Sequence, residues 1–568
     1  MQKKWNIHHI KNSEVISDLQ NTLAVDETIA KLLALRGITN FEEAKTFFRP
    51  NLDMLHDPFL MKGMHVAIER IIKAINNKEK VLIFGDYDVD GTTSVALVYS
   101  FFKNYISEIR YYIPDRYAEG YGISFKSIDY ASENNYSLII ALDCGIKAND
   151  KIDYANSKNI DFIICDHHLP GDEIPKAVAV LDPKQLDCPY PYKELAGCGI
   201  GFKVAQAFCI QNGMDEQEAF QYLDLVVTSI AADIVPITGE NRVLAHFGIK
   251  QINQNPRPGI KALFALTKQD KEIDITTIVF TIAPRINAAG RIEHGSKAVE
   301  LLISDTDEAT EFSKKINETN SQRRDIDISI TDEAFETMDL DPITPFKKST
   351  VLFNPDWHKG VVGIVASRMI ERYYKPTIIL TESNGMATGS ARSVKDFDVY
   401  TAIENCSHLL EQFGGHKFAA GLSLKLENVK AFTEAFENEV SRTIKTEMLN
   451  PSVEIDLEIL LDNINDKLIR ILSQFAPHGP HNMTPVFCSK NVLDTGYAKI
   501  VGNNHLKLEV YQPHTQLTKI EAIGFNKGDF LNFFKRNIPV DIVYKIKVNE
   551  FRGATTIQLL VEEIMPSA

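Results

Sequence analysis

An apolar run that ends in closely spaced acids, VLIFGDYDVDG at residues 81–91, is the feature that most constrains how this chain can fold. The run VLIFG predicts a short buried strand, and the turn after it places Asp86, Asp88 and Asp90 at the carboxyl end of that strand. Crowded carboxylates repel one another and are costly to bury unless a cation lies among them. The stretch therefore predicts a divalent-metal site at the edge of a sheet.

The chain after this stretch alternates between strand-like and helix-like patterns. Further strands are expected at EIRYYIP (108–114), YSLIIALD (136–143), IDFIICD (160–166) and AVAVLD (177–182), with helical segments between several of them. Alternation of this kind predicts a doubly wound parallel sheet, whose ligands lie at the carboxyl ends of its strands. The following hundred or so residues, 195–291, are mostly helical in pattern.

The second half of the chain predicts three further parts. Residues 305–338 are polar, favour helix and contain neither Gly nor Pro, which is typical of a connecting helix between domains. Strand and helix signals alternate again over residues 350–440. From residue 451 onward, short β-like segments separated by Gly, Asn and Pro predict a small antiparallel barrel or sandwich. The expected fold class is therefore α/β and multi-domain, with a C-terminal β-barrel.

Composition narrows the class of protein. A chain of 568 residues, 44% hydrophobic and 24% charged, exceeds what one core usually supports. There is no apolar signal core or membrane-length apolar stretch, and the seven cysteines form no CxxC pair. We therefore expect a soluble cytoplasmic protein with neither a zinc finger nor a disulfide framework. The net charge of −15 argues against a polyanion partner, although acids gathered around metal ions can dominate such a sum.

Other metal-capable side chains lie where this fold would bring them near the first acids. Asp143 and the triplet Asp166-His167-His168 end two of the expected strands, and Asp233 lies in SIAADIVP. A single strand-terminal Asp is more often a helix cap or a turn residue. Four acidic sites joined by a His pair fit a metal centre better. Oxygen and imidazole ligands suit manganese or magnesium, and two such ions about 3.5–4 Å apart are the usual arrangement for phosphodiester or phosphoanhydride hydrolysis.

These motifs carry a family resemblance. DYDVDG, Asp143, the DHH triplet and Asp233 resemble, in order and spacing, the four motifs of the DHH phosphoesterases. Five further stretches narrow the likeness: IPDRYAEGYG (113–122), APRINAAGR (283–291), WHKGVVGIVASR (357–368), GSARS (389–393) and GGHKFAAG (414–421). Together they resemble the bacterial RecJ family of single-strand-specific DNA exonucleases, from about residue 50 onward.

The resemblance implies a domain order that agrees with the patterns above. The expected parts are an N-terminal segment (1–49), a DHH catalytic domain with a helical part (50–304), a connecting helix (305–344), a DHH-associated domain (345–446) and an OB domain (447–568). No additional partner-binding domain is expected after the OB domain.

The resemblance also implies roles for individual residues. The metal ligands would be Asp88, Asp90, Asp143, His167 and Asp233. Asp143 would bridge the two ions, His168 would contact the scissile phosphate, and Asp86 would orient a ligand. One position departs from the pattern, because Phe84 stands where many relatives have a histidine, four residues before Asp88. How fully and how tightly this chain holds the first metal is therefore left open.

Three stretches are candidates for holding the nucleic acid. Gly414, Gly415 and His416 could approach a phosphate, although a tight turn before a helix would produce the same letters. In GSARS a guanidinium flanked by hydroxyls suits bidentate phosphate capture, and in the family this region holds the 5′ end of the substrate. Other arginines could line the same path, although an arginine taken alone is more often in a surface ion pair. The remaining candidates are Ser390, Arg392, Ser393, Arg116, Arg285 and Arg291.

The C-terminal part is locally basic, although the net charge of the whole chain is negative. Residues 489–548 contain nine Lys or Arg against five Asp or Glu, with aromatic residues interspersed. Basic groups that follow phosphates and aromatic rings that stack on bases are what sequence-independent single-strand binding needs. About half of these aromatics are expected in the barrel core. They are Tyr497, Tyr511, Phe525, Phe530 and Tyr544.

The expected function is a processive 5′ to 3′ exonuclease that cuts single-stranded DNA to mononucleotides with two Mn²⁺ or Mg²⁺ ions. One alternative is a DHH phosphodiesterase acting on short oligoribonucleotides or cyclic dinucleotides, which would lack an OB domain. A second is a non-catalytic scaffold of the replication fork, which should have lost metal ligands. The family also implies a helicase and a single-strand-binding protein as partners, and we expect a monomer that does not associate with membranes.

Overall fold

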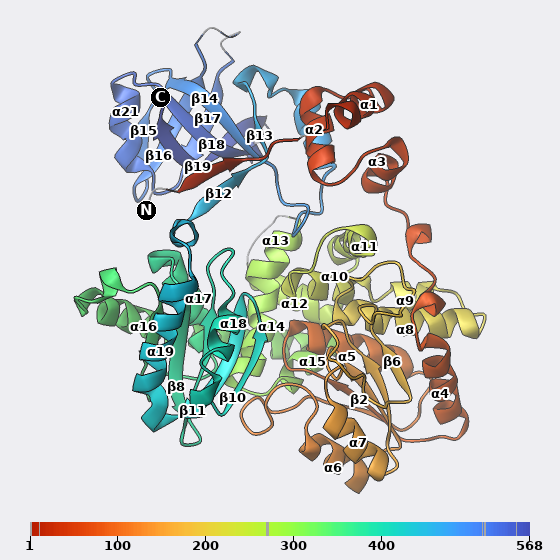
Figure 1. The fold of residues 1–568 in the computed structure, drawn as a ribbon. Helices are drawn as coiled ribbons and strands as arrows, with labels where there is room; N and C mark the ends of the chain where they lie inside the picture. The colour runs from red at the N-terminus through yellow and green to blue at the C-terminus, as the bar shows by residue number, and fades with distance from the viewer. Residues whose placement is uncertain are drawn as a thin grey trace.

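The computed structural model describes residues 3–10, 12–267, 272–513, 515, 518–551 and 554–567. Two α/β parts lie side by side, and a β-barrel flanked by the N-terminal helices lies above them (Figure 1). Within these described ranges, no helix is both long and apolar enough to span a bilayer. The expected α/β multi-domain fold with a C-terminal barrel is confirmed.

The first α/β part is built on a fully parallel sheet in the order β3-β2-β4-β5-β6. Its strands are β2 (Val81–Gly85), β3 (Ile109–Tyr112), β4 (Leu138–Leu142), β5 (Asp161–Cys165) and β6 (Ala179–Leu181). Alternate residues of β2 enter two different cores, Val81 and Ile83 on one face and Leu82 and Phe84 on the other. Because both faces are covered, the strands read as continuous apolar runs.

Helices cover both faces of this sheet and extend it into a helical part. They are α4 (Met64–Asn76), α5 (Val89–Phe102), α6 (Phe125–Glu133), α7 (Asn149–Ser157), α8 (Gly197–Gln211), α9 (Gln217–Phe220), α10 (Leu223–Ala232), α11 (Gly239–Gln254), α12 (Pro258–Ala265), α13 (Ile275–Thr277), α14 (Ala283–Ile292) and α15 (Ser296–Ile303). A short π-helix, η3 (Ile278–Ile282), joins α13 to α14.

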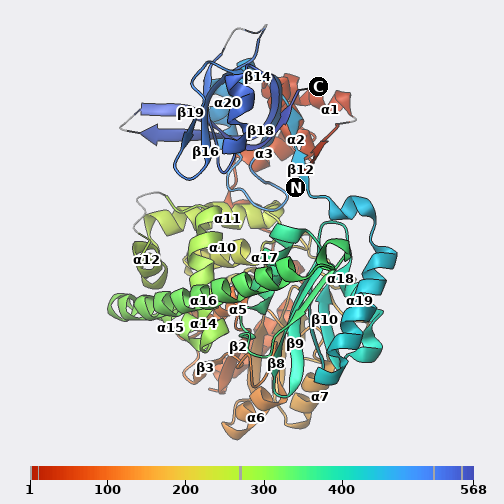
Figure 2. The ribbon, with the colours of Figure 1, turned by 90° about the vertical axis from the view of Figure 1, so that its left-hand side faces the viewer.

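One long helix, α16 (Thr306–Leu340), connects the two α/β parts. Its 35 residues make it roughly 50 Å long at about 1.5 Å per residue, and the side chain of Asp305 caps its start. The helix packs against α12, α14 and α15 of the first part and against α17 (Val362–Tyr373) of the second (Figure 2). Contacts at both ends place the two α/β parts in a defined arrangement.

The second α/β part has a five-stranded sheet in the order β10-β11-β9-β8-β7, parallel only between β7 and β8. Its remaining elements are β7 (Thr350–Phe353), β8 (Thr377–Ser383), β9 (Met386–Arg392), β10 (Gln412–His416), β11 (Ala419–Lys425), α18 (Val399–Glu404) and α19 (Val429–Thr443). Separate apolar cores cover its two faces, one of them shared with α16.

The C-terminal barrel closes where β14 pairs with β16, so its strands run in the circular order β14-β16-β17-β19-β18. Its elements are β12 (Ser452–Ile455), β13 (Leu457–Glu458), α20 (Asp466–Ser473), β14 (Val486–Asp494), β15 (Lys499–Val501), β16 (His505–Tyr511), β17 (Ile520–Gly524), α21 (Leu531–Lys535), β18 (Val540–Phe551) and β19 (Ala554–Pro566). A five-stranded barrel with β17 parallel to β19 has the topology of an OB fold.

The N-terminal segment packs on this barrel. Its elements are β1 (Lys4–Ile7), α1 (Ser13–Leu23), α2 (Glu27–Leu35) and α3 (Phe41–Phe48), and β1 pairs with β12. The helices share one apolar core with the barrel, and buried Arg242 on α11 ties this unit to the helical extension of the first α/β part. Arg242 stacks on the ring of Phe47 at 3.8 Å and donates to the carbonyls of Phe47 and Phe475. The two ends of the chain therefore form one structural unit.

Candidate active site

Asp88 lies where β2 passes into α5, at the carboxyl edge of the parallel sheet. It is the N-cap of α5, and its Oδ1 accepts a hydrogen bond from the backbone N–H of Gly91 at 2.9 Å. Gly91 leaves no room for a side chain, since a Cβ there would lie 2.4 Å from the backbone oxygen of Asp86. The glycine of DYDVDG therefore allows the acid-bearing turn to fold tightly.

Asp90, in the first turn of α5, accepts four hydrogen bonds at its carboxylate, the longest of them from Ser94 Oγ at 3.5 Å. The backbone amides of Gly197 and Cys198, at the start of α8, donate at 2.7 and 2.8 Å, and Ser229 Oγ on α10 donates at 2.7 Å. A helix N-terminus favours negative charge, so this arrangement stabilises a buried carboxylate. Three helices thus meet at one acid.

Asp143 follows β4 with a left-handed backbone, φ 59°. Its carboxylate is buried, and no described residue donates to its Oδ2. Gly197 makes this position possible, because a Cβ on that residue would lie 2.8 Å from the Cβ of Asp143. A strained backbone and a buried carboxylate oxygen without a hydrogen-bond partner are typical of a residue that binds a metal ion.

His167 brings the predicted acids together. Its Nε2 lies 3.2 Å from Asp143 Oδ1 and 3.6 Å from an oxygen of both Asp90 and Asp233. The ring is buried, and neither ring nitrogen has a hydrogen-bond partner among the described residues. One imidazole nitrogen therefore faces three carboxylates that come from three different elements.

Burial and mutual repulsion shift the pKa values at this edge of the sheet. Burial, and then the neighbouring Asp90 and Asp88, raise the pKa of Asp143 well above its usual range. The same two causes raise the pKa of Asp233 to about 8. Burial lowers the pKa of His167. A bound cation would stabilise the ionised form of these acids, and it would bind the imidazole in its neutral form.

His168 is held at one nitrogen by Asp166. Its Nδ1 lies 2.7 Å from Asp166 Oδ1, while Asp166 Oδ2 accepts from the backbone N–H of Ile146 at 2.8 Å. Burial disfavours the charged forms of Asp166 and His168, but the hydrogen bond between the two side chains and the attraction of their opposite charges favour these forms more strongly. The pKa of Asp166 falls to about 2, and that of His168 rises to about 9. His168 therefore points its second nitrogen away from a fixed carboxylate.

Asp86 and Phe84 lie on the other side of this edge. Both oxygens of the Asp86 carboxylate are buried without a hydrogen-bond partner among the described residues. Burial, and then the charge of Asp88, raise the pKa of Asp86 well above its usual range. Phe84 is buried in the apolar cluster between the sheet and helices α6 and α7, and its ring stacks on Tyr112 at 5.9 Å. Phe84 thus acts as a core residue.

The donor set fits a pair of hard divalent cations. Two groups of three side chains, within the part of the chain that the structure describes, have ligand atoms within 4.8 Å of one another. One is Asp90, His167 and Asp233, and the other is Asp143, His167 and His168. Asp88 belongs to neither group, although its carboxyl lies against Asp143. Carboxylates with one or two imidazoles suit Mn²⁺ or Mg²⁺, and the unpartnered atoms of Asp143 and His167 point to such an occupant.

Arg392 and Ser390 form a polar pair on β9 of the second α/β part. The Nη1 of Arg392 donates to Ser390 Oγ at 2.7 Å. Gly363, in the first turn of α17, approaches both side chains, since a Cβ there would lie 2.9 Å from Arg392 Nη2 and 3.2 Å from Ser390 Oγ. A guanidinium, a hydroxyl and a helix N-terminus together make a suitable site for a phosphate.

Arg291 and Arg116 extend this basic region across to the first part. The Nη1 of Arg291 donates to the carbonyl of Gly360 at 3.0 Å, and the Nε of Arg116 donates to the carbonyl of Gly290 at 2.8 Å. Burial, and then the charges of Arg116 and Arg392, lower the pKa of Arg291 to about 10. Three arginines that repel one another favour an anion between the two α/β parts.

Two of the predicted substrate residues lie apart from this group. The Nε of Arg285 donates to Asn317 on α16 at 3.0 Å, and its Nη1 donates to the carbonyl of Thr281. The hydroxyl of Ser393 donates to the carbonyl of Phe397 at 2.8 Å and so stabilises a turn. The structure brings neither side chain to the phosphate-binding pair.

The glycine-rich stretch 414–416 is a strand in a hairpin with β11, where the sequence also allowed a turn before a helix. Gly414 pairs with Gly421, and Gly415 has φ 147°. Burial, and then the charges of Arg392 and His168, lower the pKa of His416. The hairpin therefore places His416 within electrostatic reach of both Arg392 and His168.

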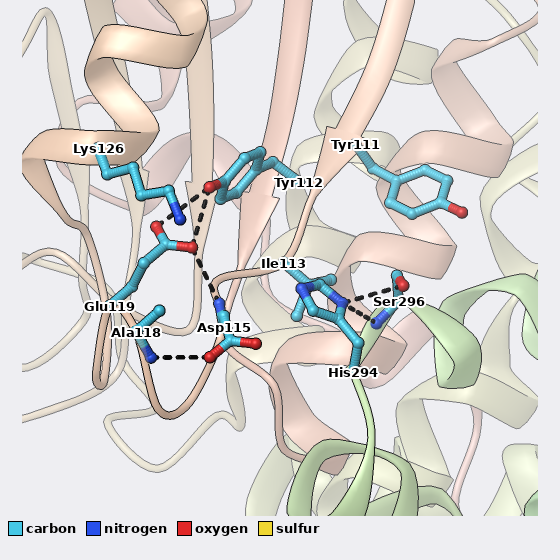
Figure 3. A pocket seen from close by; sticks show the side chains of 9 residues that line it. All are labelled: Tyr111, Tyr112, Ile113, Asp115, Ala118, Glu119, Lys126, His294 and Ser296. Carbon is cyan, nitrogen blue, oxygen red and sulfur yellow. Dashed lines mark hydrogen bonds between the residues drawn. The ribbon is translucent and has the colours of Figure 1, made fainter. Parts of the chain in front are cut away.

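A cavity of about 380 Å³ lies beside the loop of residues 113–122 (Figure 3). In it, Glu119 accepts hydrogen bonds from the Tyr112 hydroxyl and from the backbone N–H of Asp115, and Asp115 accepts from the backbone N–H of Ala118. None of the metal-capable residues lines it. These acids stabilise the loop that carries Arg116.

Three sequence families match successive parts of the chain. The DHH family N-terminal domain matches residues 80–230, the DHHA1 domain residues 347–442 and the RecJ OB domain residues 455–563. A Bacillus subtilis protein named single-stranded-DNA-specific exonuclease RecJ is 35% identical over 99% of this chain and 70% of its own length. This chain belongs to the RecJ family. The RecJ of Escherichia coli is 31% identical over 95% of this chain and 96% of its own length.

The fold agrees with that of a solved RecJ. A crystal structure of RecJ from Thermus thermophilus in complex with Mn²⁺ matches with a TM-score of 0.85, covering 100% of this chain and 80% of that one. The two sequences are 23% identical, so this match speaks for the fold alone. The sequence family and the fold of the RecJ family thus coincide over this chain.

The structure also brings in residues that sequence reasoning did not assign. Asp166 holds His168, Ser229 holds Asp90, and Gly197 and Gly363 allow close approaches. The left-handed or crowded glycines within motifs were a usable signal. The hydroxyl of Ser229, one turn before Asp233 on α10, gave none, because serines on helices are common.

Proposed function

We propose that this protein is a metal-dependent exonuclease that hydrolyses single-stranded DNA from its 5′ end to mononucleotides, in DNA repair and recombination. The observation that carries the proposal is the unpartnered Nε2 of His167 among three carboxylates, opposite the Arg392–Ser390 pair. The relatives in the RecJ family are named as exonucleases specific for single-stranded DNA, and a solved member holds Mn²⁺. These findings support metal-assisted phosphodiester hydrolysis.

The proposed ligands of two Mn²⁺ or Mg²⁺ ions are Asp88, Asp90, Asp143, His167 and Asp233. Asp143 is the proposed bridge, because one of its oxygens faces His167 and the other is unpartnered among the described residues. Such ions lower the pKa of a bound water and offset charge on the reacting phosphate. Hydrogen bonds from α8 keep Asp90 in place, so its carboxylate would not need to reorganise when an ion binds.

The chain's own cations would bind and orient the strand. Arg392 and Ser390 would hold the terminal phosphate, and Arg116 and Arg291 would line the path from that site to the acids. His168, whose Nδ1 is fixed by Asp166, would present Nε2 to the scissile phosphate and either stabilise its charge or protonate the leaving oxygen. A phosphate site on one side of the acids would set the end from which cleavage begins.

Preference for a single strand has two supports. His416 on the β10–β11 hairpin is close enough for the charge of His168 to affect its pKa, so the strand would pass between this hairpin and the acids. The OB barrel adds a surface for unpaired nucleotides beyond this passage. A phosphodiesterase for dinucleotides would not need that barrel, and a non-catalytic scaffold would not need buried, mutually repelling acids.

The test is release of nucleotides from 5′-labelled and 3′-labelled single strands with Mn²⁺, compared with a duplex of the same sequence. We expect labelled mononucleotide at once from the 5′ label, late release from the 3′ label and little release from the duplex. Immediate release from the 3′ label would reverse the polarity. Preference for dinucleotides over long strands would favour the short-substrate alternative.

Several expectations remain predictions about this chain. They are the domain boundaries, the assignment of individual ligands, the monomeric state, the cytoplasmic location, and a helicase and a single-strand-binding protein as partners.

A further inference from the structure

Tyr121 lies at the tip of the loop 113–122, between two glycines that both have left-handed backbones, Gly120 at φ 87° and Gly122 at φ 76°. Its side chain is 56% exposed, which is unusual for a tyrosine so close to buried acids. The Tyr121 hydroxyl lies 3.4 Å from His168 Nε2. The exposed nitrogen of His168 therefore has a partner supplied by a separate loop.

The two contacts of His168 act on opposite ends of the same ring. Asp166 Oδ1 lies 2.7 Å from Nδ1, and the hydroxyl of Tyr121 lies near Nε2. A histidine held only at Nδ1 can still swing about that bond, whereas a contact at each nitrogen fixes the plane of the ring. For His168 to donate to the phosphate, Nε2 must carry a hydrogen, and the oxygen of Tyr121 then accepts it.

The ring of Tyr121 is itself supported by neighbours. It packs edge-on against Tyr87 at 6.1 Å, and the guanidinium of Arg116 lies 4.1 Å from the centroid of the Tyr87 ring. Tyr87 is buried within DYDVDG, next to the acids. This series of contacts connects a cation on the proposed strand path to His168, so the hydroxyl of Tyr121 has a defined position.

The geometry points to Tyr121 as a positioning residue: its hydroxyl oxygen accepts from the Nε2–H of His168 and keeps that N–H turned toward the scissile phosphate, which shares it once the strand is bound. The inference rests on the proposed function, because it assigns His168 to the reacting phosphate. Binding of DNA would then depend little on this hydroxyl, while the chemical step would depend on it.

The kinetic test is a double-mutant cycle of Tyr121→Phe and His168→Gln, with kcat and KM measured on a single strand over a range of its concentrations. We expect Tyr121→Phe to lower kcat about three- to tenfold with KM unchanged, as for loss of one hydrogen bond. His168→Gln should lower kcat by about 10²–10⁴-fold, as for loss of an acid–base group. Adding Tyr121→Phe to His168→Gln should then change nothing further.

Other results would overturn the inference. If Tyr121→Phe has the same effect with and without His168, the hydroxyl acts on the DNA directly. A change in KM alone, or no change in either constant, would contradict a positioning role. The matched control is Tyr154→Phe, which removes a 2.7 Å hydrogen bond to Asp129 on a distant helix and should leave both constants unchanged.

A second measurement needs no activity, so it separates this inference from the proposed function. In ¹⁵N-histidine-labelled protein, the ring resonances of His168 can be assigned by their loss in His168→Gln. Tyr121→Phe should shift them, and Tyr154→Phe should not. If Tyr121→Phe leaves the His168 resonances unshifted, the positioning role is refuted. If it shifts them but the wild-type protein releases no nucleotide, the proposed function is refuted and the contact between Tyr121 and His168 is established.

Discussion

The acid edge of the parallel sheet and the outer face of the barrel would serve the same DNA in opposite ways. At the edge, buried carboxylates have fixed positions, and the carboxylate of Asp90 alone accepts four hydrogen bonds. On the barrel, Tyr497 and Phe525 are 40% and 52% exposed. Chemistry on one phosphate requires exact placement of charge, whereas binding of any base sequence requires accessible rings and flexible cations.

The barrel face places its cations on neighbouring strands and its exposed rings in the adjoining loops. Lys499 lies 4.3 Å from the ring of Tyr497, and Lys507, paired with Lys499 across β15 and β16, lies 5.7 Å from it. Phe525 packs edge-on against His505 at 5.0 Å. In OB folds the face of the second and third strands, here β16 and β17, is the usual site for oligonucleotides.

The largest effect is expected from Asp143→Asn, which keeps the shape of the side chain but removes a buried charge. Nucleotide release should fall by about 10²–10³-fold or more, as for other charged groups at reacting centres. The melting temperature in EDTA should stay equal or rise, because burial and the neighbouring acids already disfavour the Asp143 carboxylate. The rise in melting temperature that Mn²⁺ gives the wild type should disappear.

The matched control for Asp143→Asn is Asp182→Asn. Asp182 is also a buried acid at the end of a strand, and burial raises its pKa to about 7, but it belongs to neither metal-capable group. Asp182→Asn should lower activity by less than about tenfold, below the 10–100-fold typical of groups that hold metal ligands in place. If the two variants behave alike, the edge is a general acidic surface and the comparison with the barrel fails.

The next effect is expected at the phosphate-binding pair. Arg392→Gln should slow the release of the first nucleotide from 5′-phosphorylated strands by about 10–100-fold, mainly through KM, because a charge-assisted hydrogen bond contributes about 1.5–3 kcal/mol. The difference in rate between Arg392→Gln and the wild type should be smaller on strands that have a 5′ hydroxyl. Ser390→Ala should weaken binding, but Ser393→Ala should not, since that hydroxyl donates to the carbonyl of Phe397. Equal effects of the two serines would place the phosphate elsewhere.

A smaller and different effect is expected on the barrel. Tyr497→Ala and Phe525→Ala should each weaken binding of long strands by about 1–3 kcal/mol per stacked base, with little change in cleavage of strands too short to reach the barrel. Lys499→Gln should reduce the slope of log affinity against log salt by about 0.7. The control is Phe346→Ser, at an 84% exposed ring in the turn after α16. Loss of cleavage on all lengths would mean that the barrel supports the catalytic part structurally.

The sequence predicted the acid edge because parallel strands end at one edge. Asp143 and His167 could be assigned to the same place from strand ends alone, and the structure puts their side chains 3.2 Å apart. The barrel aromatics were harder to assign to the core or to the surface, because period-two alternation does not separate the two in short strands. Tyr544 proves to be fully buried, with its hydroxyl 2.8 Å from that of Ser489.

The positions of other side chains have physical reasons that the sequence partly contained. Arg285 and Arg291 are six residues apart on one helix, about 240° around its axis, so both could not face the same path. The contact of Arg242 with Phe47 joins residues almost two hundred positions apart, which no local pattern reveals. Tyr121 lies in a loop without periodicity, and only its distance to His168 distinguishes it from an ordinary surface tyrosine.

The smallest effect is expected at Phe84, where sequence reasoning anticipated a difference in the metal site. Phe84 and Asp86 lie two residues apart, but the ring of Phe84 belongs to an apolar core and to neither metal-capable group. Phe84→His should therefore change the affinity for Mn²⁺, measured by calorimetry, by less than about tenfold, the lower range for outer-shell partners.

Stability gives the second measure for Phe84. A buried imidazole without a partner costs about 1–3 kcal/mol, so Phe84→His should lower the free energy of unfolding by that amount unless Asp86 accepts its N–H. Phe84→Leu, which keeps the site apolar, is the control for lost packing. If Phe84→His instead binds Mn²⁺ far more tightly than the wild type, residue 84 is part of the metal site and the acid edge extends further back along β2 than its geometry indicates.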